Sequence, residues 1–522
     1  MKKRIKIYYG YKKFKEKTFN YIPLRFIFAT LITTLEVIAI IALVINLCIY
    51  IPYFSWVVVA SVLITEIRII ASDDNPDYKI PWMFFVLTLP VIGLMLFIIF
   101  ASRKLKPKFV RKLSVVKEKT YINNNIKVLE DIEKKDIYAS NQARNICNIA
   151  DTNVFKNAKL KYFSSGEQYF LNLVEDLKNA SKFIYMEYFI IEEGKFWNTI
   201  LEILVAKVKE GVDVKVIFDD IGCMQTLPGN YAKKLCKLGI EATTFSRLKG
   251  QADSEFNNRN HRKITVIDGY IGYTGGINLA DEYINEYQRF GHWKDTGIRI
   301  EGEAVWEYTR LFLIDFVLNV KKVSEITYEI YPHVNNIKEK GFVVPFGDGP
   351  KPLYDHQIGK IVIQNMLASA TKYAYMTSPY LIIDNDLCLS IENAALRGVD
   401  VKIIVPGIPD KKLVNDMTKS YYKRLMNAGV KIYEYKPGFI HAKTYIVDDK
   451  YAMVGTINLD YRSLVHHFEN AIWIYDCECI KDIKKDVEET LEKSVKVLPS
   501  MLKTKLRNRI FRALVRVFAP LL

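Results

Sequence analysis

The sequence predicts an α/β protein built from two tandem copies of one domain, preceded by helices that cross a membrane. The pattern His-x-Lys-x4-Asp occurs at residues 261–268 and again at residues 441–448, an offset of 441 minus 261, or 180, residues. Each copy is followed at the same distance by a glycine turn and an asparagine, Asn278 in the first copy and Asn458 in the second. The chain contains only 7 histidines, so this agreement indicates an internal duplication.

Residues 1–110 are expected to form a membrane-spanning region of two or three helices. No charged residue lies from Pro81 to Ser102, a run about as long as a helix needs to cross a bilayer. Phe26–Thr65 contains one charge, Glu36, and is long enough for two further crossings. A signal peptide would be shorter and would not be followed by another apolar run.

The charged flanks leave two interpretations of the topology open. Nine basic residues lie in the segment Lys2–Arg25 and six in the segment Arg103–Lys112, and both segments favour the cytoplasm. The acidic loop Asp73–Asp77 is expected on the external side. Three full crossings cannot place both basic flanks in the cytoplasm. Either one apolar run is interfacial or re-entrant, or one flank lies on the opposite side.

Two domains are expected after a linker at residues 111–150, the first at residues 151–335 and the second at residues 336–500. In each of them, short apolar runs alternate with amphipathic helical patterns, and Gly211–Ile217 and Gly398–Ile404 are matching runs of this kind. Such alternation is typical of α/β domains with largely buried strands.

The charge balance implies an anionic partner. Lys and Arg number 74 against 58 Asp and Glu, which gives a net charge of +16 and fits nucleic acid or anionic lipid. Residues 501–522 have the pattern of an amphipathic basic helix, which either lies in the headgroup layer of an anionic bilayer or docks on the protein core. The 7 cysteines are scattered and form no zinc-binding pattern.

The repeated motif carries the residue types that phosphodiester transfer requires. One imidazole can attack phosphorus to form a phosphohistidine, and the other can protonate the leaving alkoxide. Lys263 and Lys443, with Asn278 and Asn458, are expected to bind the non-bridging oxygens and neutralise the charge of the transition state. Because the lysines supply the positive charge, no metal and no other cofactor is expected.

Each imidazole needs a partner on its second nitrogen that fixes the tautomer. In the second half Glu469 lies 28 residues after His441, and in the first half Asp295 lies 34 residues after His261. We therefore expect each carboxylate to serve the histidine of its own half. The acidic residues at 281–282 are the alternative in the first half, and a surface salt bridge is the alternative role for either carboxylate.

The aspartates that end the two motifs, Asp268 and Asp448, are candidate site residues by pattern. On a straight strand, however, a residue seven positions beyond the histidine lies about 23 Å away from it, at roughly 3.3 Å per residue. We therefore expect both aspartates to form a structural salt bridge or to cap the turn at the end of the strand.

These motifs resemble those of the phospholipase D superfamily, and in particular those of its bacterial cardiolipin synthases. The segments that carry the resemblance are Asn260–Lys263, Gly275–Tyr283, Thr377–Tyr380, Gly455–Ser463 and Phe518–Leu522. The resemblance implies two tandem phospholipase D-like domains, with mixed sheets flanked by helices and related by a pseudo-twofold axis. It also implies that His261 is the nucleophile and that His441 acts first as the acid and then as the base.

The activity implied by the resemblance is transfer of a phosphatidyl group between two phosphatidylglycerol molecules, which gives cardiolipin and glycerol at a bacterial cell membrane. A membrane phospholipase D that hydrolyses or exchanges headgroups would use the same residues. A nucleic-acid phosphodiesterase fits the net charge, but much of the basic excess lies beside the apolar runs and in the terminal helix, so no nucleic-acid partner is expected. An inactive membrane scaffold would not need His and Lys in both copies. One chain supplies both half-sites, so catalysis does not require an oligomer.

Overall fold

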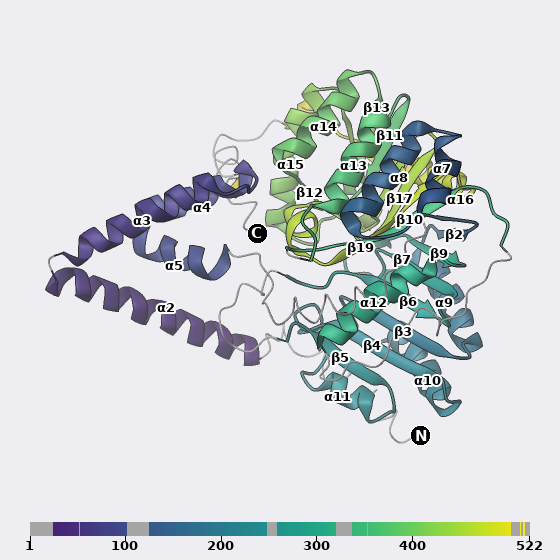
Figure 1. Ribbon diagram of the computed structural model, residues 1–522, viewed down its shortest axis with the longest axis horizontal. Coiled ribbons are helices and arrows are strands. Elements are labelled where there is room, and N and C mark those ends of the chain that lie inside the picture. Colours follow the sequence, from purple (N-terminus) through teal and green to yellow (C-terminus); the bar gives the residue numbers. More distant parts are fainter. Residues whose placement is uncertain are drawn as a thin grey trace.

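The protein consists of two α/β units side by side and a helical arm that projects from them (Figure 1). The computed structural model describes residues 24–51, 53–101, 125–247, 258–319, 337–351 and 353–502, together with residues 512, 515 and 516. The predicted C-terminal helix at 501–522 therefore lies largely outside the described residues, as does the segment 111–124 of the predicted linker.

The first unit is a mixed seven-stranded sheet in the order β2-β9-β7-β6-β3-β4-β5. Its strands are β2 (Lys159–Phe163), β3 (Phe183–Tyr188), β4 (Asp213–Asp219), β5 (Glu241–Phe245), β6 (Lys263–Ile267), β7 (Ile271–Gly275) and β9 (Gly297–Glu301). Its helices are α9 (Gly166–Asn179), α10 (Lys195–Lys209), α11 (Tyr231–Cys236) and α12 (Val305–Asn319). Strands β3, β4 and β5 are parallel neighbours and the others pair antiparallel.

The second unit is a nine-stranded sheet in the order β1-β10-β19-β17-β16-β11-β13-β14-β20. Its strands are β1 (Phe155–Lys156), β10 (Phe342–Asp348), β11 (Tyr373–Thr377), β13 (Asp400–Pro406), β14 (Lys431–Tyr435), β16 (Thr444–Val447), β17 (Tyr451–Gly455), β19 (Glu469–Tyr475) and β20 (Ser494–Lys496). Its helices are α13 (Ile358–Ser369), α14 (Asn385–Leu396), α15 (Lys412–Asn427) and α16 (Cys479–Glu492). The order β9-β7-β6-β3-β4-β5 of the first sheet recurs as β19-β17-β16-β11-β13-β14, which confirms the predicted duplication and the α/β class.

Helix α12 joins the two units. It packs against β3, β5, β6 and β7 of the first sheet and against β10 of the second. All residues from Val305 to Leu318 are buried, because this helix has a sheet on each side rather than solvent on one. A short parallel pair close to the repeated motifs, β8 (His292–Lys294) with β15 (Gly438–Ile440), also connects the halves.

The segment predicted as a linker belongs in part to the second unit. Residues 125–150 form α7 (Asn125–Glu133) and α8 (Ile137–Ala150), and α8 packs on α13 and β10. The reason is an apolar stripe at helical spacing, Ala139, Ala143 and Ile146, which the second core buries. Strand β1, expected in the first domain, likewise pairs with β10 of the second sheet.

The arm contains two apolar helices long enough to cross a bilayer, Thr30–Tyr50 within α2 (Leu24–Tyr50) and α3 (Phe54–Ala71). Many of their large apolar side chains point outward, including Leu35, Ile38 and Ile67, each more than half exposed. Such a surface suits lipid rather than water.

The third apolar run is not a continuous crossing. It is divided into α4 (Pro76–Thr88) and α5 (Pro90–Phe100), and Leu89 between them leaves the helical conformation (φ −130°, ψ 70°). The cause is Pro90, which lacks an N–H for the helix and disfavours helical geometry in the residue before it. Helix α5 therefore folds back, and both α4 and α5 pack on each other and on α3 (Figure 1).

The acidic loop between α3 and α4 docks on the second unit. The Asn75 amide donates a hydrogen bond of 2.8 Å to Asp384. Asp77 Oδ2 accepts hydrogen bonds from the Asn385 backbone N–H at 2.6 Å and from the Tyr461 hydroxyl at 3.2 Å. Asn75 and Asp77 of this loop therefore have partners in the second unit.

Candidate active site

The two motif histidines lie where the halves meet. The His261 backbone N–H donates to the Phe468 carbonyl oxygen (2.9 Å), and the His441 backbone N–H donates to the Lys294 carbonyl oxygen (2.7 Å). Each histidine is thus anchored to the residue that precedes a carboxylate of the other half. Both imidazoles are nearly enclosed, with His261 6% and His441 8% exposed.

The imidazole–carboxylate pairs cross between the halves. His261 Nδ1 lies 2.9 Å from both carboxylate oxygens of Glu469, and His441 Nδ1 lies 2.7 Å from Asp295 Oδ2. The predicted pairing within each half was therefore wrong, although the two carboxylates were the right residues. The reason is that β19, which begins at Glu469, runs next to the start of the first motif, and β8 runs next to the second.

Both carboxylates are fully buried and hydrogen-bonded. Glu469 accepts from the Ser463 hydroxyl at 2.6 Å and from the Thr456 hydroxyl. Burial opposes its ionisation, but His261 and the surrounding donors outweigh burial and hold the pKa of Glu469 below its ordinary value. Asp295 accepts from the Thr296 backbone N–H at 2.8 Å, and burial raises the pKa of Asp295 to about 6.

The side chains of both motif lysines are completely buried next to the histidines. Lys263 Nζ donates to the His261 carbonyl oxygen at 2.6 Å, and Lys443 Nζ donates to the His441 carbonyl oxygen and lies 2.8 Å from His441 Nδ1. Burial lowers the pKa of Lys443 to about 8 and lowers the pKa of Lys263 well below its ordinary value. An anion that enters between them would favour their charged forms.

Burial also makes both imidazoles neutral at physiological pH. It lowers the pKa of His261 to about 3, despite the opposing effect of Glu469, and lowers the pKa of His441 well below its ordinary value. A neutral imidazole whose Nδ1–H donates to a carboxylate presents an unprotonated Nε2, which is the nucleophilic form. The second imidazole can gain a proton when an anionic phosphodiester enters the site, because the added negative charge raises its pKa.

The two motif asparagines differ in their surroundings. Asn278 is engaged with protein groups: its Oδ1 accepts from the Ile190 backbone N–H at 3.0 Å, and its amide donates to the Tyr283 hydroxyl at 2.7 Å. In the described part of the chain the Asn458 side chain makes no hydrogen bond, and its Oδ1 is buried. Of the two, Asn458 therefore keeps an amide available for an oxygen of a bound phosphate.

The motif aspartates lie at the far ends of their strands and cap turns. Asp268 accepts four hydrogen bonds from Ser181–Phe183, and Asp448 accepts four from Thr371–Tyr373, all of 2.7–2.9 Å. Both take the left-handed conformation, with φ of 53° and 54°, which aspartate tolerates better than most residues. The structure brings neither of them to the histidines.

A buried ionic cluster that the motif analysis missed supports the first motif from behind. Arg262 is completely buried, pairs with Asp315 of α12 at 2.8 Å and donates to the Glu469 carbonyl oxygen at 3.0 Å. The Asn260 amide donates to Asp315 at 3.2 Å and to Glu187 of β3. The sequence did contain a signal, because Glu187 is the one charged residue of an otherwise apolar strand and Asp315 lies within the apolar run Leu311–Leu318.

One group among the described residues could hold a metal ion. His467 lies beside the nucleophile candidate, with its ring centroid 5.5 Å from that of His261 and its Nδ1 3.7 Å from Glu469. The potential ligand atoms of His261, His467 and Glu469 lie within 4.8 Å of one another. Because a cation at this place would occupy His261 and its carboxylate, it would compete with the nucleophile rather than assist it.

Comparison with known proteins gives consistent matches. The family model described as "Cardiolipin synthase, PLD-like domain" matches residues 173–302 and 363–491. An uncharacterized protein of Streptococcus mutans is 42% identical over 454 residues, which are 85% of this chain and 96% of that protein. A cardiolipin synthase of Halalkalibacterium halodurans is 31% identical over 474 residues (90% and 94%), and cardiolipin synthase 2 of Bacillus anthracis is 32% identical over 461 residues (87% and 88%).

The fold is also similar to a solved structure. The crystal structure of phosphatidylserine synthase from Haemophilus influenzae superimposes with a TM-score of 0.56 and covers 73% of this chain and 98% of that one. The two sequences are 17% identical over this region, so the likeness concerns the fold.

Proposed function

Because the chain belongs to the phospholipase D-like family of phospholipid-metabolising enzymes that includes the bacterial cardiolipin synthases, we propose that it is itself a cardiolipin synthase. The reaction is transfer of a phosphatidyl group from one phosphatidylglycerol to a free hydroxyl of another. The observation that carries the proposal is the crossed site, in which two neutral imidazoles are each held by a carboxylate of the opposite half next to a buried lysine.

In the first half-reaction His261 Nε2 attacks the phosphorus of phosphatidylglycerol. The new P–N bond forms as the bond from phosphorus to the glycerol oxygen breaks, and His441 gives its proton to that oxygen so that glycerol leaves. Lys263, Lys443 and the free amide of Asn458 bind the non-bridging oxygens. Asp295 stabilises the imidazolium of His441 before this proton transfer.

In the second half-reaction His441 is the base. It takes the proton from a hydroxyl of a second phosphatidylglycerol, whose oxygen attacks phosphorus while the P–N bond breaks. Cardiolipin forms and His261 is regenerated. The low exposure of both imidazoles supports this acceptor, because a hydroxyl must react in preference to water.

The activity is tested with membranes that contain the full chain and phosphatidylglycerol labelled in its fatty acids and glycerol. Cardiolipin with release of glycerol in equal amount would support the proposal. Phosphatidic acid as the labelled lipid product would overturn it in favour of a hydrolytic phospholipase D.

The pH dependence of transfer is expected to be bell-shaped. Below the Asp295 pKa of about 6 this carboxyl is protonated and no longer supports the His441 imidazolium, and above the Lys443 pKa of about 8 the ammonium charge is lost. The measurement is kcat/KM against pH, since this ratio reports ionisations of the free enzyme. In a Lys443→Arg protein the alkaline limb should move upward, because a guanidinium stays protonated. An alkaline limb that does not move would assign it to another group.

We also propose a topology in which α2 and α3 cross a bacterial cell membrane and the α4–α5 hairpin re-enters it from the side of the α/β units. Two crossings and one re-entrant hairpin put both basic flanks, Lys2–Arg25 and Arg103–Lys112, on the cytoplasmic side. Docking of Asn75 and Asp77 on the second unit supports the same arrangement.

The topology is tested by cysteine labelling of intact cells with a membrane-impermeant maleimide. A Tyr53→Cys protein, altered at the exposed turn between α2 and α3, should be labelled from outside. An Asp73→Cys protein should react only after the membrane is opened. The parental chain, with its own Cys48 and Cys236, is the control. Labelling of Asp73→Cys in intact cells would contradict the topology.

A further inference from the structure

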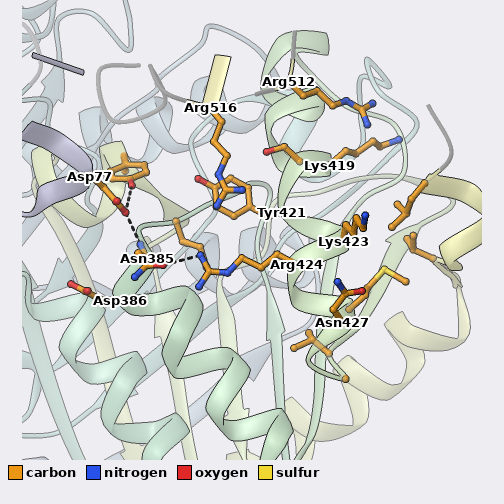
Figure 2. Close-up of a pocket in the computed structure, with 18 of the residues that line it drawn as sticks. Asp77, Asn385, Asp386, Lys419, Tyr421, Lys423, Arg424, Asn427, Arg512 and Arg516 are labelled. Atoms are coloured by element: carbon orange, nitrogen blue, oxygen red, sulfur yellow. Dashed lines mark hydrogen bonds between the residues drawn. The ribbon is translucent and has the colours of Figure 1, made fainter. Parts of the chain in front are cut away.

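A large cleft separate from the histidine pair lies where the arm meets the second unit. Its volume is about 1230 Å³, and its walls come from the start of α4, from α15, from the end of β20 and from the terminal residues Arg512 and Arg516 (Figure 2). None of the candidate catalytic residues lines it. Tyr461, three residues after Asn458, lies on its wall and hydrogen-bonds to Asp77 of the arm.

The cleft is strongly basic. Its lining residues include seven cations and two carboxylates. The cations are Lys419, Lys423, Arg424, Lys431, Lys496, Arg512 and Arg516, and the carboxylates are Asp77 and Asp386. A wall of this composition favours an anionic occupant.

Several of these cations are already neutralised by carboxylates outside the cleft. Arg424 forms a two-point ion pair with Glu392, and Arg512 lies 2.8 Å from Asp416. Lys419 Nζ lies 3.3 Å from the Glu434 carboxylate, and Lys431 Nζ lies 2.6 Å from the Asp400 carboxylate.

The positive charge that remains lies on three walls of the cleft, those formed by α15, by the end of β20 and by the terminal residues. In the described part of the chain Lys423, Lys496 and Arg516 have no acidic group within 4.0 Å. Arg516 lies over the Tyr421 ring, 4.4 Å from its centroid, and Figure 2 shows its side chain directed toward that ring. The positive charges of Lys423 and Arg516 are therefore not neutralised by any carboxylate of the described residues. Their N–H groups can donate hydrogen bonds to an anion in the cleft.

Other parts of the lining are apolar, and one of them belongs to the arm. Ile80 and Pro81 of α4 line one side, and Ile80 is 55% exposed. Leu498 and Leu502 line another, with Leu498 50% exposed. A ligand that matches both kinds of wall carries a negative headgroup and an apolar body.

We propose that this cleft binds an anionic phospholipid as a second, non-catalytic lipid site, with the phosphodiester at Lys423 and Arg516 and the glycerol and acyl parts along α4. The inference rests on the membrane placement proposed above but not on which hydroxyl accepts the phosphatidyl group. Guanidinium and ammonium groups are the usual protein ligands of phosphate oxygens, and the entrance beside α4 lies where lipid headgroups would be.

The test uses the full chain carrying His261→Ala in uncharged detergent, so that no turnover or covalent intermediate contributes. The probe is a phosphatidylglycerol with a photoreactive group in its headgroup, and labelled peptides are identified by mass spectrometry. We expect labelling within residues 419–431 and 496–502. It should fall about tenfold in a Lys423→Gln/Arg516→Gln protein, since each basic group near an anionic lipid contributes several-fold in affinity.

A matched control removes the same charge elsewhere. A Lys134→Gln/Lys485→Gln protein alters two lysines whose side chains are 75% and 77% exposed on other faces, and it should keep the labelling.

Equal labelling by a phosphatidylcholine probe, or labelling that survives Lys423→Gln/Arg516→Gln, would overturn the proposal. Displacement of the probe by inorganic phosphate as effectively as by short-chain phosphatidylglycerol would assign the cleft to a soluble phosphate instead. Because the His261→Ala protein makes no cardiolipin, these outcomes are independent of the synthase assay.

Discussion

Replacement of His261 by alanine is expected to lower the rate of phosphatidyl transfer by about 10⁵-fold or more, as loss of a nucleophile does in other covalent enzymes. His261 is the residue whose imidazole is held neutral by burial and aimed by Glu469. Without it, the second phosphatidylglycerol would have to displace glycerol directly. The measurement is cardiolipin formation per enzyme over a long incubation. An exposed histidine outside the site, changed as His356→Ala, is the matched control and should keep full activity.

The same variants separate the roles of the two histidines. A phosphatidyl ester with a p-nitrophenol leaving group needs no acid for its departure, so a His441→Ala protein should release one equivalent of p-nitrophenolate and then stop. The phosphatidyl group should remain on His261, because deprotonation of the acceptor hydroxyl requires His441. Phosphorylated imidazole at residue 441 in a His261→Ala protein would reverse the assignment.

The sequence was sufficient for the repeat, the α/β class and the two histidine–lysine pairs, because each depends on local pattern or on exact recurrence. It was not sufficient for the partner of each histidine. Glu469 and Asp295 were recognisable as carboxylates at corresponding positions, but whether a strand end faces its own half or the other is decided by how two sheets pack. No local propensity carries that information.

The sequence predicted the apolar helices of the arm but did not show where the third run is broken. Pro90 was visible in the sequence, yet an uncharged run of sufficient length reads as one crossing by hydropathy whether or not it is broken. The contact of the acidic loop with Asn385 and Tyr461 was not visible in the sequence, because these partners lie more than 300 residues away. The break is a local effect of Pro90, whereas the loop contact depends on tertiary packing.

The crossed arrangement makes a second prediction of large effect, that Glu469→Gln and Asp295→Asn each lower cardiolipin synthesis by about 10³–10⁴-fold, as loss of the orienting carboxylate does in hydrolytic triads. Both substitutions keep the side-chain shape and remove the charge that fixes the imidazole tautomer. Steady-state rates alone cannot separate crossed pairs from pairs within each half, because every turnover uses both histidines.

The p-nitrophenol ester separates them, because its first step needs the nucleophile but not the acid. With Glu469 on His261 and Asp295 on His441, the Asp295→Asn protein should keep the burst of p-nitrophenolate and the Glu469→Gln protein should lose it. Pairing within each half requires the opposite outcome from the same two proteins. An Asp448→Asn protein controls for loss of a half-buried, hydrogen-bonded carboxylate away from the site and should keep both the burst and turnover. The burst therefore reports which half of the molecule orients the attacking imidazole, independently of how much activity either substitution leaves.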